Sequence, residues 1–117
     1  MSALASTPEP PYYTVIFSSV RSNTEDGYDD TALRMVQLAA EQPGYLGIES
    51  ARSGIGITVS YWRDLESIKQ WKQNAEHLQA QKSGRQKWYD SFVVRVARVD
   101  KEYRMGDSTA TQPNAED

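Results

Sequence analysis

Apolar and polar residues alternate along two segments of the chain. In residues 12–21, Tyr13, Val15 and Phe17 share one side, and Thr14, Ile16, Ser18 and Val20 share the other. In residues 55–62, one side carries Ile55, Ile57, Val59 and Tyr61, and the other carries Thr58, Ser60 and Trp62. A period of two is that of a β-strand, because successive side chains point to opposite faces. Both segments are therefore predicted to be strands.

The period changes to that of a helix at Asp64. Leu65, Ile68 and Trp71 follow at helical spacing, and the carboxylate of Asp64 is a good acceptor for the free amides of a first helical turn. Trp71 is therefore expected to point toward the sheet. Asn74 is expected to cap a further helix over residues 75–87.

Three more elements complete the expected order. After a polar loop of residues 22–30, helical spacing relates Ala32, Met35, Val36, Ala39 and Ala40, and this helix is expected to end at Pro43-Gly44. Further strands are expected over residues 45–52 and 91–103. The order βαββαβ predicts a ferredoxin-like α+β fold, an antiparallel sheet with both helices on one face.

The outer face of this sheet is expected to be apolar as well. In the last strand, Phe92, Val94 and Val96 are set against Val93, Ala97 and Val99, so neither face is clearly polar. An exposed apolar sheet face needs a cover. The simplest cover is a second copy of the chain, so we expect a homodimer with sheet packed on sheet.

A chain of 117 residues fits a single domain, expected over residues 12–105. The proline-containing residues 1–11 and the acidic residues 106–117 are expected to be disordered ends, so their removal should leave the fold intact.

Charge and composition limit the classes of binding partner and the compartment that we expect for this protein. The chain has 13 basic and 16 acidic residues, and three of the acids lie after residue 106. Residues 1–106 therefore carry equal numbers of basic and acidic side chains. No basic cluster indicates nucleic acid. The absence of cysteine fits a reducing compartment. Since the start of the chain lacks the pattern of a signal peptide, a cytoplasmic location without membrane contact is expected.

The run from Gly56 to His77 carries a local pattern, in which a strand ends in Trp62-Arg63-Asp64 and the following helical stretch ends at Asn74-Ala75-Glu76-His77. This pattern resembles the antibiotic biosynthesis monooxygenase (ABM) family, and the order of elements extends the resemblance over residues 12–103. The resemblance implies a dimeric α/β barrel with a pocket between each sheet and its helices. It also implies a cofactor-independent monooxygenase acting on a small aromatic quinol or phenol.

Three residues are candidate catalytic groups under this resemblance. His77, the only histidine, would accept a proton from the phenol. Trp71 would stack on the aromatic ring, and Asn74 would donate a hydrogen bond to the oxygen being converted. Each also has a structural alternative: an exposed helix position for His77, a core position for Trp71 and a helix cap for Asn74.

Four residues are candidates for substrate binding: Trp62, Arg63, Ser18 and Phe17. Trp62 also suits packing or a dimer contact, and Arg63, like Arg85, also suits a solvated surface position. The hydroxyls of Ser18 and Ser19 either line the pocket or satisfy nearby backbone groups.

The sequence lacks the residues that several other kinds of catalytic and binding site require. The chain has no Gly-x-Ser-x-Gly sequence, no Gly-rich phosphate loop after a strand, and too few histidines and cysteines for a typical zinc site. No metal and no cofactor are therefore expected. Haem degradation is disfavoured, because the resemblance places the proximal histidine of that subgroup at Gln81. The remaining alternative is a non-catalytic barrel that binds a small molecule or serves a stress response.

Overall fold

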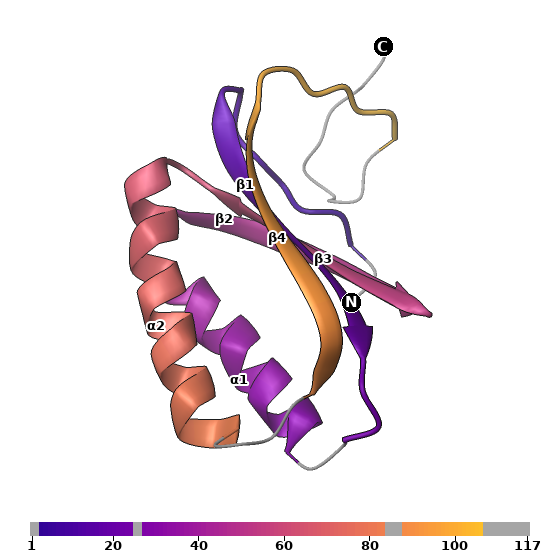
Figure 1. Cartoon of the computed structure of the whole chain (residues 1–117). Coiled ribbons are helices and arrows are strands. Elements are labelled where there is room, and N and C mark those ends of the chain that lie inside the picture. The colour runs from indigo at the N-terminus through magenta and orange to yellow at the C-terminus, as the bar shows by residue number, and fades with distance from the viewer. Residues whose placement is uncertain (1–2, 25–26, 84–87, 107–117) are drawn as a thin grey trace.

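The computed structural model describes residues 3–24, 27–83 and 88–106. In these residues the chain forms, in order, β1 (Tyr12–Arg21), α1 (Tyr28–Ala40), β2 (Tyr45–Ser53), β3 (Ile55–Trp62), α2 (Leu65–Ser83) and β4 (Tyr89–Val99). The strands form one sheet in the order β2-β3-β1-β4, and every neighbouring pair is antiparallel. Both helices lie on one face of this sheet (Figure 1). The predicted ferredoxin-like α+β fold is confirmed.

The strand register assigns each side chain to a face. Tyr13 pairs with Trp62, and Val15 pairs with Ser60. Because directly paired residues point the same way, these side chains share the face that α1 and α2 cover, called here the helix face. The other face, called here the open face, carries the alternate residues, among them Tyr12, Ile57 and Tyr61. The alternation predicted from the sequence is therefore present, and it is the Trp62 side that meets the helices.

The core lies between the helix face and the two helices. Trp62 has no exposed surface, and it packs with Ala39 of α1 and Ile68 of α2. Its indole Nε1 donates a hydrogen bond to the Ser60 hydroxyl at 2.8 Å, so its one polar group is satisfied although it is buried. Trp71 of α2 stacks on Trp62, with ring centroids 5.9 Å apart and an interplanar angle of 21°. Trp71 therefore points toward the sheet, as predicted.

Asp64 caps α2 as expected. Its Oδ1 accepts a hydrogen bond from the backbone N–H of Ser67 at 2.8 Å. Hydrogen bonds from the side chain and the backbone of Ser67, followed by one from Arg63, lower the pKa of the Asp64 carboxyl. The carboxylate is thus kept ionised at the positive end of the helix.

The prediction that Asn74 caps a second helix is wrong, because α2 continues without a break through Asn74. The sequence between Leu65 and Ser83 contains no glycine or proline, and an asparagine inside a helix costs less than about 1 kcal/mol. The inward-facing residues of α2 also continue past Asn74, since Leu78 is buried. Packing of this stripe favours one long helix over two short ones.

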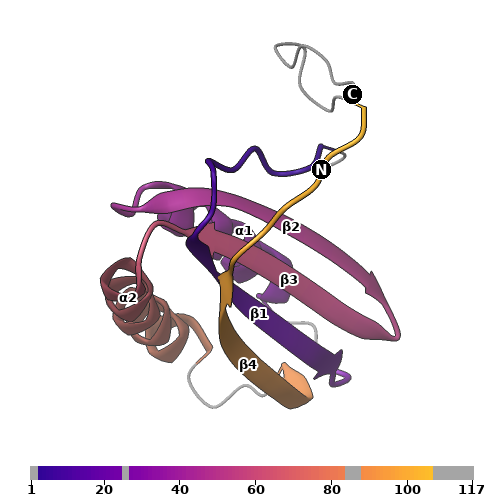
Figure 2. The same cartoon turned by 90° about the horizontal axis from the view of Figure 1, so that it is seen from above.

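The last strand also differs from its predicted range of residues 91–103. It starts earlier, at Tyr89, and it ends at Val99. Beyond it, the side chains of Glu102 and Arg104 form hydrogen bonds with the N-terminal segment. Figure 2 shows these two terminal segments running beside one another, away from α2. α1 likewise begins at Tyr28, inside the expected loop.

Candidate functional site

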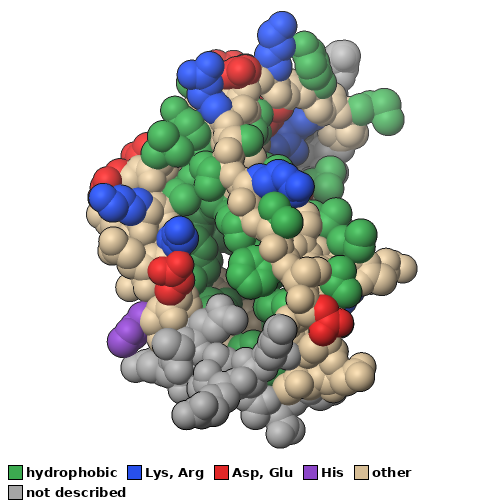
Figure 3. All heavy atoms as spheres, viewed as in Figure 1, with side chains coloured by type: hydrophobic (Ala, Val, Ile, Leu, Met, Phe, Trp, Pro, Cys, Tyr) green, Lys and Arg blue, Asp and Glu red, His purple; other side chains and the backbone are tan. Residues whose placement is uncertain are grey.

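An apolar hollow lies on the helix face between α2 and β4. Helix α1 packs on β2 and α2 packs on β3, toward one edge of the sheet. The inner side chains of β4 are consequently left uncovered: Phe92, Val94 and Val96 are 57%, 47% and 50% exposed. Figure 3 shows apolar side chains gathered in this hollow beside the β4 strand.

The floor and one wall of the hollow come from three elements. Val15 and Phe17 of β1 pair with Val96 and Val94 of β4, so these four side chains share the helix face. Trp71 extends over the sheet from α2 and is half-buried. Apolar floors with an aromatic wall suit flat aromatic ligands.

Aromatic residues cluster at one end of the hollow. The Phe17 ring lies 5.2 Å from the ring of Tyr89 and 5.4 Å from that of Phe92. The hydroxyl of Tyr89 donates to that of Tyr28, the first residue of α1, over a long 3.4 Å. Burial, followed by the hydrogen bond with Tyr28, raises the pKa of Tyr89. This phenol therefore stays protonated and acts as a hydrogen-bond donor.

The three predicted catalytic residues all lie on α2, but only Trp71 faces the sheet. His77 is exposed. Asn74 is also exposed, and its side-chain amide donates to Oε1 of Gln42 at 3.0 Å, beside the turn that follows α1. Trp71 stacks on Trp62 of the core, whereas His77 and Asn74 are exposed, so the structure does not gather the three side chains around one point.

The four predicted substrate-binding residues are also distributed. Trp62 is fully buried beneath Trp71, and Arg63 is exposed with its Nε 3.2 Å from Oδ2 of Asp64. Phe17 lies on the helix face, whereas its neighbour Ser18 lies on the open face. Phe17 is thus the one of the four that lines the hollow. Arg85 lies outside the described residues.

Sequence reasoning missed Tyr28, Tyr89 and Arg52 as residues of this end of the hollow. Arg52 donates from Nη2 to the Ser19 hydroxyl at 2.5 Å, across 33 positions of sequence. One signal was available, because Gly56 interrupts the strand that separates these two residues. A glycine inside a strand often marks the close approach of another group.

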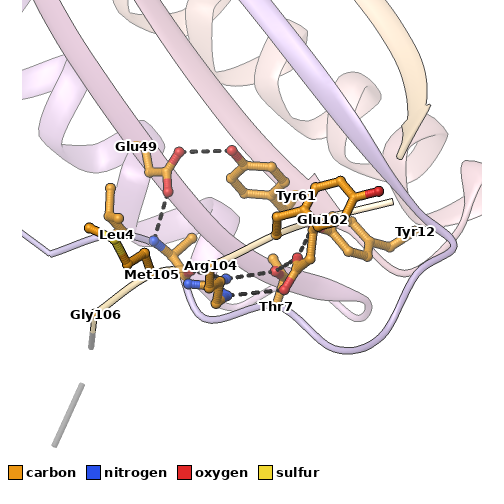
Figure 4. A pocket seen from close by; sticks show the side chains of 11 residues that line it. Leu4, Thr7, Tyr12, Glu49, Tyr61, Glu102, Arg104, Met105 and Gly106 are labelled. Carbon is orange, nitrogen blue, oxygen red and sulfur yellow. Dashed lines mark hydrogen bonds and ion pairs between the residues drawn. The ribbon is translucent and has the colours of Figure 1, made fainter. Parts of the chain in front are cut away.

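A second hollow lies on the open face, under a terminal strap formed by residues 3–11 and 100–106. It has a volume of about 260 Å³, and Figure 4 shows Tyr12, Tyr61, Glu49, Glu102 and Arg104 around it. Tyr61 donates to Glu49 at 2.7 Å, and Glu49 also accepts from the backbone N–H of Ala5 at 2.8 Å. Burial, followed by the bond to Glu49, raises the pKa of Tyr61.

Arg104 and Glu102 join the two segments of the strap. Nη2 of Arg104 donates to the carbonyl of Ala5 at 2.8 Å and to the hydroxyl of Thr7 at 3.0 Å. The Glu102 carboxylate accepts hydrogen bonds from the hydroxyls of Thr7 and Tyr12, and it pairs with Nε of Arg104 at 3.0 Å. Burial alone would raise the pKa of Glu102, but these three hydrogen bonds outweigh it and lower the pKa. The polar groups of this hollow are therefore engaged with one another.

Deleting residues 1–8 is expected to lower the free energy of unfolding by no more than about 1 kcal/mol, because water can replace the strap's partly exposed hydrogen bonds. Urea unfolding of the full and shortened chains measures the difference. The pKa of Glu102 is lower in the folded chain than its ordinary value of 4.5. The contribution of Glu102 to the free energy of unfolding is therefore present above pH 4.5 and is lost as the pH falls below it. A large loss of stability at neutral pH would show that the strap is an integral part of the domain.

The described residues contain no group of three or more His, Cys, Asp or Glu side chains placed to hold a metal ion. Neither described helix has the length and hydropathy needed to cross a bilayer.

Comparison with known proteins assigns the family. Residues 11–83 match the model of the family described as antibiotic biosynthesis monooxygenase. The chain belongs to the ABM family. The uncharacterised protein YqjZ of Bacillus subtilis is 53% identical over 111 residues, which cover 93% of this chain and 97% of YqjZ.

Solved structures agree with the ABM fold. SnoaB of Streptomyces nogalater, described as a cofactor-independent oxygenase, aligns with a TM-score of 0.59 at 9% identity over 82% of this chain and 98% of SnoaB. The protein SO0527 of Shewanella oneidensis aligns with a TM-score of 0.62 at 10% identity, over 76% of this chain and 91% of its own. At these identities the likeness concerns the fold alone.

Proposed function

We propose that this ABM protein is a cofactor-independent monooxygenase acting on a small aromatic quinol or phenol. The observation that carries the proposal is the uncovered apolar hollow between α2 and β4, with Trp71 as its wall. SnoaB, an oxygenase that needs no cofactor by its description, has the same fold. In this chemistry the ionised substrate is itself electron-rich enough to react with oxygen. The protein has to bind the ring, assist loss of the proton and limit access of water.

The roles proposed for individual residues follow from their places. The substrate ring lies against Trp71 and Phe17. His77 is the proposed base, since it is the only histidine and imidazole changes its protonation near neutral pH. Its exposed side chain requires the substrate hydroxyl to point out of the hollow.

The proposed hydrogen bond from Asn74 to the substrate requires the amide to leave Gln42. Trp62 supports the wall from below. Arg63 and Ser18 lie outside the hollow, so the proposal gives them no contact with the substrate ring.

Filling the hollow tests the proposal. Val94→Trp should abolish oxygen consumption with hydroquinones and anthrones, because an indole at this half-exposed floor position occupies the space of the substrate ring. The matched control is Leu33→Trp, at a 60% exposed position on α1, and it should retain the parental rate. Oxygen uptake that survives in Val94→Trp, or that is absent from the parent with every substrate, would count against the proposal.

A non-catalytic ligand-binding protein is the second candidate. The exposure of His77 favours it, because the described part of the hollow then carries no histidine. Saturable binding of aromatic compounds without oxygen consumption would support this function.

We also propose that the protein is a homodimer in which the two open faces meet, and that it is located in the cytoplasm. Away from the strap, the open face exposes four apolar side chains, those of Val20, Ile55, Ile57 and Val93. A monomer would present this patch to water, whereas family members with this fold pair such faces.

Light scattering is expected to give twice the chain mass of 13.2 kDa. Ile57→Lys, which places a charge in the middle of the patch, should shift the mass toward that of one chain. Leu33→Lys on α1 serves as the control and should leave the dimer intact. A parent protein with the mass of a single chain at micromolar concentration would exclude the dimer.

A further inference from the structure

Arg52 lies at the aromatic end of the hollow, in a row of residues that crosses the helix face. The register pairs Arg52 of β2 with Gly56 of β3, Gly56 with Ser19 of β1, and Ser19 with Phe92 of β4. The Arg52 side chain follows this row over Gly56 toward Ser19. A β-carbon at Gly56 would lie 2.1 Å from Cζ of Arg52, so the glycine provides the space for the guanidinium.

Ser19 holds the guanidinium in this position. The buried Ser19 hydroxyl accepts from Nη2 at 2.5 Å, and its carbonyl oxygen lies 3.5 Å from Nη1. Both groups are neutral, and no ion pair formed between described residues includes Arg52. A guanidinium has five N–H donors, so most of those of Arg52 remain available on its exposed side.

The other described arginine near this end, Arg21, already binds groups of the protein. Arg21 donates from Nε to the carbonyl of Trp88 at 3.2 Å and from Nη2 to that of Thr24 at 3.0 Å. Its Cζ also lies 3.4 Å from the centre of the Tyr28 ring. Among the described arginines at this end, Arg52 is therefore the one available to a ligand.

The surroundings of Arg52 combine this cation with aromatic surface and a phenol donor. The rings of Phe17, Phe92 and Tyr89 form one contacting group beside Ser19. The Tyr89 hydroxyl makes only a long bond to Tyr28, and the positive charge of Arg52 acts on it.

We propose that Arg52, positioned by Ser19 and Gly56, binds the carboxylate of a small aromatic acid whose ring lies on Phe17 and Phe92. The Tyr89 hydroxyl is the second donor, and it turns from its long bond with Tyr28 to the carboxylate. The planar fork of a guanidinium matches a carboxylate with two parallel hydrogen bonds. The inference rests on the proposed function in placing the substrate ring in the hollow, and it narrows the substrate to an aromatic compound that carries a carboxylate.

Calorimetric titration with 2-naphthoate and with neutral 2-naphthamide tests this site, because the two compounds have nearly the same shape. The parent protein should bind the carboxylate about tenfold more tightly or better, which is the effect of one charge-assisted hydrogen bond. Arg52→Gln should remove this preference and leave binding of the amide unchanged.

Gly56→Ala provides a second variant that keeps the charge. Its methyl group displaces only the flexible end of the Arg52 side chain, so the fold should survive while the guanidinium leaves Ser19. The preference for naphthoate should fall as in Arg52→Gln. Arg34→Gln, which removes an exposed arginine of α1, should keep the parental preference.

Three results would overturn the site: a preference for naphthoate that Arg52→Gln retains, one that Arg34→Gln loses equally, or a parent protein that binds neither compound. The result is independent of turnover. An Arg52-dependent preference in a protein that consumes no oxygen would reject the monooxygenase and keep the carboxylate site. Oxygen uptake by the parent protein, together with an unchanged preference for naphthoate in Arg52→Gln, would keep the monooxygenase and reject the carboxylate site.

Discussion

Trp62→Ala is expected to lower the free energy of unfolding by about 3–5 kcal/mol, the usual cost of deleting a fully buried large aromatic side chain. Trp62 has no exposed surface and packs with residues of both helices. Its removal leaves a cavity under Trp71 and also leaves the Ser60 hydroxyl without its donor. Urea unfolding followed by circular dichroism measures the change.

Trp71→Ala is the matched comparison. Its indole stacks on Trp62 but is half-buried, so this variant should lose less stability than Trp62→Ala and should remain folded at room temperature. Equal losses would show that Trp71 is as deep in the core as Trp62. A near-parental stability of Trp62→Ala would contradict the packing described for this core.

The proposed base role of His77 predicts that His77→Ala lowers the turnover of an acidic phenol by about a hundredfold, the usual scale of general-base catalysis. Because the side chain is exposed, the melting temperature should hardly change. Oxygen consumption by the parent and the variant measures the turnover.

Gln73→Ala, at another exposed position of α2, is the control and should keep the parental rate. A folded His77→Ala protein with parental turnover would remove the base assignment. The monooxygenase proposal would then need another proton acceptor, and the aromatic hollow would still be its binding site.

Local sequence was sufficient for most of the fold. The strand limits of β1 were predicted correctly, and so was the start of α2 at Asp64. These features depend on neighbours a few residues apart: the alternation of side chains along an extended chain, and a carboxylate that reaches the amide three residues later. The face on which Trp71 lies followed from helical spacing in the same way.

Asn74 shows the limit of local signals. An asparagine suits a helix cap and is also tolerated inside a helix, and the difference amounts to only about 1 kcal/mol. Burial of Leu78 beyond it contributes more than that, and such burial depends on where the sheet lies. The continuous α2 then holds His77 on its exposed side.

The sequence by itself determined the order of elements, the alternation of side chains along β1, β3 and β4, and the aromatic, histidine-containing helix that relates the chain to the ABM family. Only the tertiary structure decided which side chains meet. It placed the helices over β2 and β3, which leaves Phe92 and Val94 uncovered, and it brought Arg52 to Ser19 across Gly56. These contacts join residues far apart in the chain, and their free energies depend on register and packing that no short segment specifies.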